Sequence, residues 1–312
     1  MGEDLAPARV LAATVLVNLG LAGIVGAWAS VLWLRRCESS WAYEARRRSW
    51  ATLRLALAIT GMADVLLLWL QAAYMANASL PDALALLPAM LASTYVGRAW
   101  VGGAAGLSLV LAAAGGTVTE QRSIRLAGVF IGVSLFVYSR AAVSHAGDFG
   151  LASLQLVVES AHLAAISLWL GAVGIALAVL GRPSANSAIE RSDVVAWVRA
   201  LSAAATGALV VIVVSGVFNA WRGVGSVANL TGSAYGNTVL VKVALVAIAV
   251  ALGGLNRVVE MPRLLLALQT THGSFALPQQ RFVRILRIEA VVLFAALVAA
   301  AVLSSSPLPP AT

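Results

Sequence analysis

The residues with the clearest chemical potential are five ionisable side chains that interrupt long apolar stretches of the sequence: Asp64, Glu159, His162, Lys242 and Glu289. An ionisable group inside an apolar segment is costly, so such residues by default mark a functional site. Asp64 is therefore a candidate stepping stone for a cation or a proton. A structural carboxylic acid, hydrogen-bonded to a neighbouring helix, is the equal alternative.

Glu159 and His162 are three residues apart and share one face of an expected helix, with Trp169 two turns further along. A Glu-x-x-His pair is typical of di-iron bundles, but those need the motif twice and further glutamates. Lys242 is expected at the depth of Glu159, so an ion pair is the alternative to a transport role. Glu289 is predicted to pair with Arg287.

The histidines give the sharpest signal, because the chain has only three. His145 ends one apolar stretch and His162 lies about two turns into the next, so a short connection brings both to the same side of a membrane. Met75 ends an earlier stretch on that side. Imidazole and thioether groups suit Cu(I). The candidate metal ligands are therefore His145, His162, Met75 and Glu159, and the alternative is histidines satisfied by backbone carbonyls.

Three residues on the other side could receive a soft metal, namely Cys37, Met261 and His272. Isolated positions of this kind carry a high risk of false assignment, which favours ordinary solvated loop residues.

The elements that must position these groups follow from composition. The 312 residues are 61% hydrophobic and 11% charged, with a mean hydropathy of +0.91. This excludes an ordinary soluble enzyme and predicts an all-α, polytopic membrane bundle. Eight spans are expected over the following ranges: 10–34, 55–76, 97–118, 126–143, 154–180, 198–219, 237–256 and 288–303. We expect a single integral membrane domain over residues 1–312.

The charges predict the orientation. Of the 21 lysines and arginines, 16 follow the first, third, fifth and seventh spans, which gives about +10 on that side and zero on the other. The positive-inside rule then places both termini outside and explains the net charge of +8 without nucleic acid. The stretches 35–54 and 257–287 are expected to connect spans on the inner side. Four tryptophans are expected at the inner interface: Trp33, Trp41, Trp50 and Trp197.

Two further features bear on organisation. Residues Leu84–Leu91 are predicted to form a short interfacial helix that ends or bends at Pro88. Two short sequence similarities link residues 93–98 to 233–237 and residues 18–26 to 162–171. A parallel four-plus-four repeat and a chance match are equal interpretations of them.

An ordered series of short motifs resembles the copper resistance D family (CopD, PcoD-like). The series comprises Thr94-Tyr-Val-Gly-Arg-Ala-Trp100, Ser144-His-Ala146, Ala161-His-Leu-Ala-Ala-Ile-Ser-Leu-Trp-Leu-Gly171, Ser215-Gly-Val-Phe-Asn-Ala220, Tyr235-Gly-Asn-Thr-Val-Leu-Val-Lys242, Asn256-Arg257, Arg287-Ile-Glu289 and Leu303-Ser-Ser-Ser-Pro307. Residues 94–307 carry the resemblance, and residues 1–93 match in general character.

The resemblance implies copper movement across the bacterial cytoplasmic membrane, with uptake from an extracytoplasmic carrier of the CopC type. It implies a metal role for His145 and His162 and framework roles for Trp169, Lys242, Asn256 and Arg257. Family members often have a metal-capable histidine in the first span, where this chain has Asn18.

The leading hypothesis is therefore a copper transporter without catalysis, in which copper passes from the histidines by Asp64, Trp169 and Lys242. The chain lacks a Walker A motif, so a gradient or a coupled proton carried by Asp64 or Glu159 would drive transport. Two alternatives stay open. One is a haem-carrying membrane oxidoreductase of the cupric reductase type, and the other is a factor that delivers copper to a membrane oxidase.

Overall fold

The computed structural model describes residues 5–116, 123–181, 187–270 and 275–306. Arg122, Arg182 and His272 lie outside these residues. Within the described residues, eight helical segments are long and apolar enough to cross a membrane, which confirms the predicted number and a multi-pass helical bundle. They are α1 (Leu5–Trp33), α2 (Ser40–Ala76), α4 (Tyr95–Ala114), α5 (Ser123–Ala142), α6 (Leu154–Leu180), α7 (Ala188–Val224), α9 (Ala234–Leu255) with its continuation, and α11 (Ala276–Ser305).

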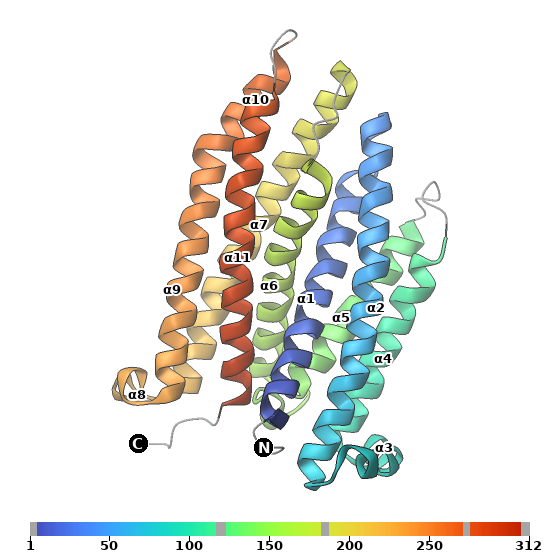
Figure 1. Cartoon of the computed structure of the whole chain (residues 1–312), viewed down its shortest axis with the longest axis vertical. Helices are drawn as coiled ribbons and strands as arrows, with labels where there is room; N and C mark the ends of the chain where they lie inside the picture. Colours follow the sequence, from blue (N-terminus) through green and yellow to red (C-terminus); the bar gives the residue numbers. More distant parts are fainter. Residues whose placement is uncertain (1–4, 117–122, 182–186, 271–274, 307–312) are drawn as a thin grey trace.

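Short elements complete the chain. The α9 helix continues through a π-helical turn, η2 (Asn256–Glu260), into α10 (Met261–Gln269), while α3 (Leu80–Ser93), α8 (Val227–Gly232) and a 3₁₀ turn, η1 (Gly147–Phe149), lie between spans. The start of α1 and the end of α11 lie at one end of the bundle, together with α3 and α8 (Figure 1). We call this the termini end; α10 lies at the opposite end. Which end faces the cytoplasm stays a prediction of the charge pattern.

Two stretches expected to connect spans are largely helical, which corrects the sequence interpretation. The α2 helix begins at Ser40 and α11 at Ala276, while α10 extends the seventh span to Gln269. Arginine is a good helix former, so the arginine-rich segments end the apolar stretch without ending the helix. Ser39 caps α2 by accepting a hydrogen bond from the backbone N–H of Ala42.

The tryptophans at the opposite end form core and not an interfacial belt. Trp41, Trp50 and Trp197 are buried, and Trp33 and Trp41 pack edge-to-face on Trp197. The Trp197 indole N–H donates to Ser30 Oγ at 3.0 Å. The expectation of interfacial tryptophans was wrong for these three because helices extend well past their apolar segments and pack there too.

The short helix predicted over Leu84–Leu91 is present as α3, and it is longer than expected. Pro88 lies inside α3, which neither ends there nor stops before Ser93. A proline removes one backbone donor and crowds the preceding turn, and a short helix outside the bundle can tolerate this.

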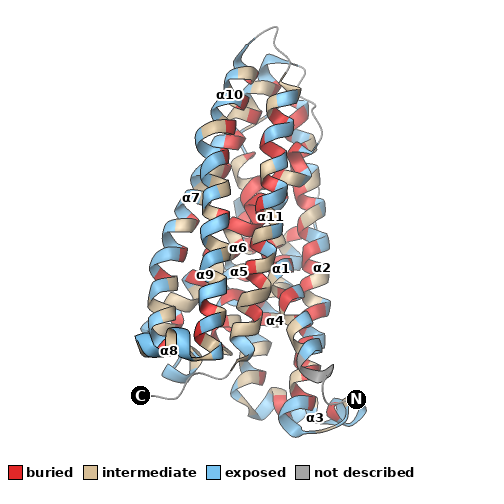
Figure 2. Ribbon diagram, turned by 60° about the vertical axis from the view of Figure 1, so that its left-hand side comes forward, coloured by how far each residue is buried: buried red, intermediate tan, exposed pale blue. Residues whose placement is uncertain are grey.

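The contacts between helices follow the predicted repeat. The α1–α2 pair corresponds to α6–α7, and the α4–α5 pair corresponds to α9–α11, with α1 packed on α6 between the two sets. At that contact the backbones touch: a Cβ on Gly171 would lie 2.0 Å from the carbonyl oxygen of Ala22. Figure 2 shows buried residues concentrated on α1, α2 and α6, with the outer faces of α7 and α9 largely exposed.

The corners before α4 and α9 repeat in atomic detail. Thr94 Oγ1 accepts from the backbone N–H of Gly97, and Ser233 Oγ accepts from that of Gly236, both at 2.9 Å. A Cβ on either glycine would lie 2.1 or 2.2 Å from a carbonyl oxygen of the preceding short helix. Both corners therefore require a hydroxyl cap and, three residues later, a glycine. This local match supports a four-plus-four repeat beyond the two short sequence similarities.

Candidate functional site

His162 is buried between α6 and α7, and a single side chain fixes its ring. Its Nδ1 lies 2.8 Å from Ser215 Oγ, and Ser215 Oγ itself donates to the carbonyl oxygen of Val211 at 2.5 Å. Because the serine proton is committed to that carbonyl, Ser215 accepts and Nδ1 carries the hydrogen. The lone pair then resides on Nε2, the atom that a metal would take from a neutral imidazole.

The backbone around His162 also leaves room for the ring. A Cβ on Gly216 would lie 3.3 Å from His162 Cε1, so glycine at this position lets α7 approach the imidazole. A hydrogen bond from the second ring nitrogen orients a ligating histidine and sets its tautomer. Ser215 and Gly216 together hold His162 in the form that can bind a soft metal.

One turn nearer the termini end, Glu159 forms a second polar contact between the same helices. Asn219 Nδ2 donates to Glu159 Oε2 at 2.7 Å. Lys242, from α9, interacts electrostatically with both Glu159 and His162. Among the described residues no ion pair joins Glu159 to Lys242, so the two interact only through their charges, and the hydrogen bond of Glu159 is to Asn219.

Deeper in the bundle, Trp169 donates its indole N–H to Glu289 Oε1 at 2.9 Å. Both residues are buried, and a Cβ on Gly253 would lie 3.2 Å from the same carboxylate oxygen. The expected pair of Glu289 with Arg287 was wrong. Because α11 begins at Ala276, Glu289 lies near the middle of that helix and faces α6 and α9.

These contacts form a polar track along one face of α6, defined by Glu159, His162 and Trp169 with their partners. Ten residues separate its ends, a rise of about 15 Å. Towards the opposite end, Asn256 donates to the carbonyl oxygen of Phe282 at 3.4 Å, and Glu260 pairs with Arg263 at 2.8 Å. Asn256 Oδ1 and Glu260 Oε2 are buried without a hydrogen-bond partner. These two oxygen atoms on η2 are hydrogen-bond acceptors that lie beyond the end of the polar track.

The other predicted ligands are not gathered at His162. His145 is exposed next to η1, where it interacts electrostatically with Glu159, and Met75 is exposed near the end of α2. Asn18 is half-buried on α1. Among the residues that the structure describes, no group of three His, Cys, Asp or Glu side chains is placed to hold a metal ion. The ligand set stays a prediction: His145 and Met75 lie at the same end of the bundle as His162, and of the two only His145 interacts with the site, through Glu159.

Asp64 belongs to a different site. It is buried on α2, and its Oδ1 lies 3.9 Å from a terminal nitrogen of Arg140 on α5. The Trp100 indole on α4 donates to the Asp64 carbonyl oxygen at 3.4 Å. These partners come from α2, α4 and α5, whereas the polar track is built by α6, α7, α9 and α11. The predicted route by Asp64 therefore shares no helix with the histidine site.

Cys37, between α1 and α2, is tied to a structural contact. Burial and the neighbouring Asp193 carboxylate raise the pKa of the Cys37 thiol to about 11. The thiolate is the metal ligand, and at neutral pH this thiol keeps its proton. Its neighbour Arg46 is buried and donates to the carbonyl oxygens of Leu34 and Cys37. This segment holds helices together, in line with the ordinary interpretation of Cys37.

Sequence reasoning alone missed several partners: Ser215, Asn219, Arg140 and Gln71. Ser215 and Asn219 are four residues apart, so they share a helix face as Glu159 and His162 do. That matched spacing was the available signal. Arg140 was counted only as a topology charge, because nothing local in the sequence links it to Asp64.

A bundle of eight membrane-length helices with an oriented imidazole and buried carboxylates defines a multi-pass membrane protein with an intramembrane polar site. Residues 195–303, which include α9 and nearly all of α7 and α11, match the family described as Copper resistance protein D. This match supports a CopD-like copper resistance protein and a copper-related membrane function. No curated protein and no solved structure matches the chain.

Proposed function

We propose that this chain moves copper across the cytoplasmic membrane of a bacterium, as Cu(I), through the polar track on α6. The observation that carries the proposal is the buried imidazole of His162, held by Ser215 with its Nε2 lone pair available. A soft monovalent cation suits a nitrogen donor of this kind, and a copper-related function is supported by the family match.

The charges around His162 fit a cation that passes through. Glu159 supplies a carboxylate one turn from the imidazole, and Lys242 offsets that charge when no cation is bound. The carboxylate of Glu289 follows on the same face of α6. Copper would thus move from His162 past Trp169 towards Glu289. Lys242 balances charge at the entrance, and Asp64 lies outside this route.

His145 and Met75 serve as the capture residues in this proposal. Both are exposed at the termini end, which the charge pattern places outside the cytoplasm. An imidazole and a thioether at the surface can accept copper from an extracytoplasmic carrier of the CopC type. The direction is uptake, the whole chain acts as one membrane domain, and we assign it no catalytic step.

Reconstituted liposomes that contain a copper-sensitive dye test the proposal. His162→Ala should reduce the initial rate of copper entry at least tenfold. Ser215→Ala should weaken copper binding by about 10–100-fold, because the ring loses the bond that sets its tautomer.

The matched control is Ser167→Ala. Ser167 is a buried serine of α6 whose hydroxyl donates to the carbonyl oxygen of Leu163. It should leave entry unchanged. Wild-type rates in a folded His162→Ala protein would refute the assignment of His162, and intact copper binding without entry in the wild type would favour a copper-delivery role.

A further inference from the structure

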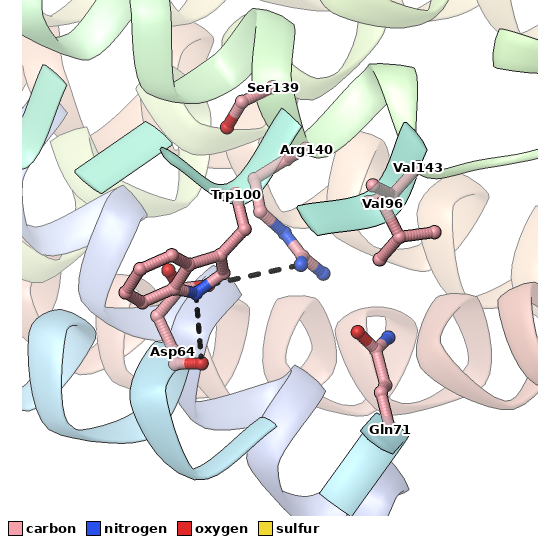
Figure 3. A pocket seen from close by; sticks show the side chains of 7 residues that line it. All are labelled: Asp64, Gln71, Val96, Trp100, Ser139, Arg140 and Val143. Atoms are coloured by element: carbon pink, nitrogen blue, oxygen red, sulfur yellow. Dashed lines mark hydrogen bonds and ion pairs between the residues drawn. The ribbon is translucent and has the colours of Figure 1, made fainter. Parts of the chain in front are cut away.

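A small cavity lies between α2, α4 and α5, apart from the polar track. Its volume is about 10 Å³, close to what one water molecule requires, and its walls carry several polar groups. The lining residues are Asp64, Gln71, Val96, Trp100, Ser139, Arg140 and Val143. Figure 3 shows the Arg140 guanidinium and the Asp64 side chain converging on this space, with Gln71 beside it.

The ion pair in this cavity is close but incomplete. The terminal nitrogen of Arg140 stays 3.9 Å from Asp64 Oδ1, beyond hydrogen-bonding distance, and Arg140 Nε is buried without a hydrogen-bond partner. A buried ion pair is stable only when hydrogen bonds satisfy the charges that burial removes from water. A water molecule in the cavity would supply such bonds. A proton on the Asp64 carboxylate would instead remove the negative charge that needs them.

Nothing else of charge faces Asp64 in the described residues. Arg140 on α5 supplies the one charge that acts on Asp64 among the described residues, and Trp100 on α4, which also lines the cavity, is neutral. The negative charge of the deprotonated Asp64 carboxylate is therefore balanced by a single guanidinium.

The cavity extends from Asp64 towards the termini end of the bundle. Gln71 is seven residues nearer the end of α2 than Asp64, about 10 Å along the helix and on the same face. Val96 is the second residue of α4, and Val143 follows the last residue of α5. Gln71 and the cavity therefore lie between Asp64 and the termini end, on helices that do not build the polar track.

We propose that Asp64 is a proton-binding site, reached from the termini end through the water of this cavity, with Arg140 as its counter-charge. A proton taken from bulk water forms an O–H bond on the carboxylate and releases Arg140, and its loss restores the ion pair. If the chain moves copper as proposed above, Asp64 is the coupling site and α6 carries the metal.

Infrared difference spectroscopy of the purified full chain, recorded as a function of pH, tests the site without copper. A protonated-carboxyl band should appear as the pH falls, vanish in Asp64→Asn and persist in Glu289→Gln, which removes a different buried carboxyl group. An unchanged band in folded Asp64→Asn would overturn the proposal. Arg140→Gln should move the band's midpoint to higher pH by about one unit, because the cation that favours the carboxylate is gone.

A liposome experiment separates the two proposals. In Asp64→Asn, copper should still enter down its gradient, but the accompanying pH change inside should be lost; His162→Ala should abolish both. Wild-type proton movement in Asp64→Asn would refute coupling. Should the wild type move no copper at all, copper transport fails, while the infrared band still decides whether Asp64 binds a proton.

Discussion

The two halves of the bundle, α1–α5 and α6–α11, use one helical framework for different chemistry. Counted from their first residues, α2 and α7 are equally long, and Gln71 and Asn219 stand at the same position. Around that shared amide the halves diverge. Ile212 stands where α2 has Asp64, and Leu67 stands where α7 has Ser215, and both are buried. Each half thus has an aliphatic residue where the other has the key polar group.

This difference shows how a repeat can separate tasks. The first half has an acid, a guanidinium and a small cavity, which suit a proton. The second half has an imidazole with an oriented lone pair, which suits a soft metal. Asn219 donates to Glu159 beside the imidazole, and its equivalent Gln71 lines the cavity beside Asp64. The contact between α1 and α6 lies between the halves and is the part that both must share.

The largest effect is expected at that shared contact. Gly171→Ala places a Cβ 2.0 Å from the carbonyl oxygen of Ala22, so α1 and α6 must move apart. We expect a loss of about 3 kcal/mol in the free energy of unfolding, measured from thermal or denaturant unfolding in detergent. Gly174→Ala is the control, because a Cβ there meets nothing within 4 Å. Equal stability of the two variants would contradict a backbone contact between the halves.

The equivalent amides offer the sharpest contrast. Asn219→Leu removes the hydrogen bond to Glu159 and should weaken copper binding by about 10–100-fold, measured by competition with a copper chelator. Gln71→Leu should leave copper affinity unchanged, because Gln71 lines the other cavity. A similar loss in both variants would show that the two sites are not separate.

A third test compares two tryptophans that make the same kind of bond to different acceptors. Trp169→Phe leaves the buried Glu289 carboxyl group without its donor and should cost about 2 kcal/mol. Trp28→Phe removes a 3.0 Å bond to the carbonyl oxygen of Leu126 and should cost about 1 kcal/mol. Unfolding midpoints in detergent measure both. The reverse order would mean that Glu289 is satisfied by groups other than Trp169.

The smallest effect is expected at the repeated corners. Thr94→Ala and Ser233→Ala each remove a helix cap, and each should cost about 1 kcal/mol in the free energy of unfolding. Because the two corners have the same geometry, the two costs should agree within the error of the unfolding curves. Clearly different losses in the free energy of unfolding for the two variants would show that the two corners are not equivalent.

The sequence predicted the membrane helices well and their partners poorly. Eight apolar stretches were enough to count the spans, because the length of a hydrophobic run is a local property. Helix ends at the opposite side were misjudged, since α2 and α11 continue through arginine-rich segments. Glu159 and His162 were found from spacing on one helix. Ser215 and Arg140 were not, because their roles depend on which helix faces which.

The sequence by itself therefore determined the class of protein, the number of spans and the short list of polar groups that an apolar interior must satisfy. Hydropathy and charge act on each segment separately, so they can be read along the chain. Only the tertiary structure decided that His162 meets Ser215 and that Asp64 meets Arg140 in a separate cavity. Those pairings arise from glycine contacts and helix faces that bring residues more than fifty positions apart within a few ångströms.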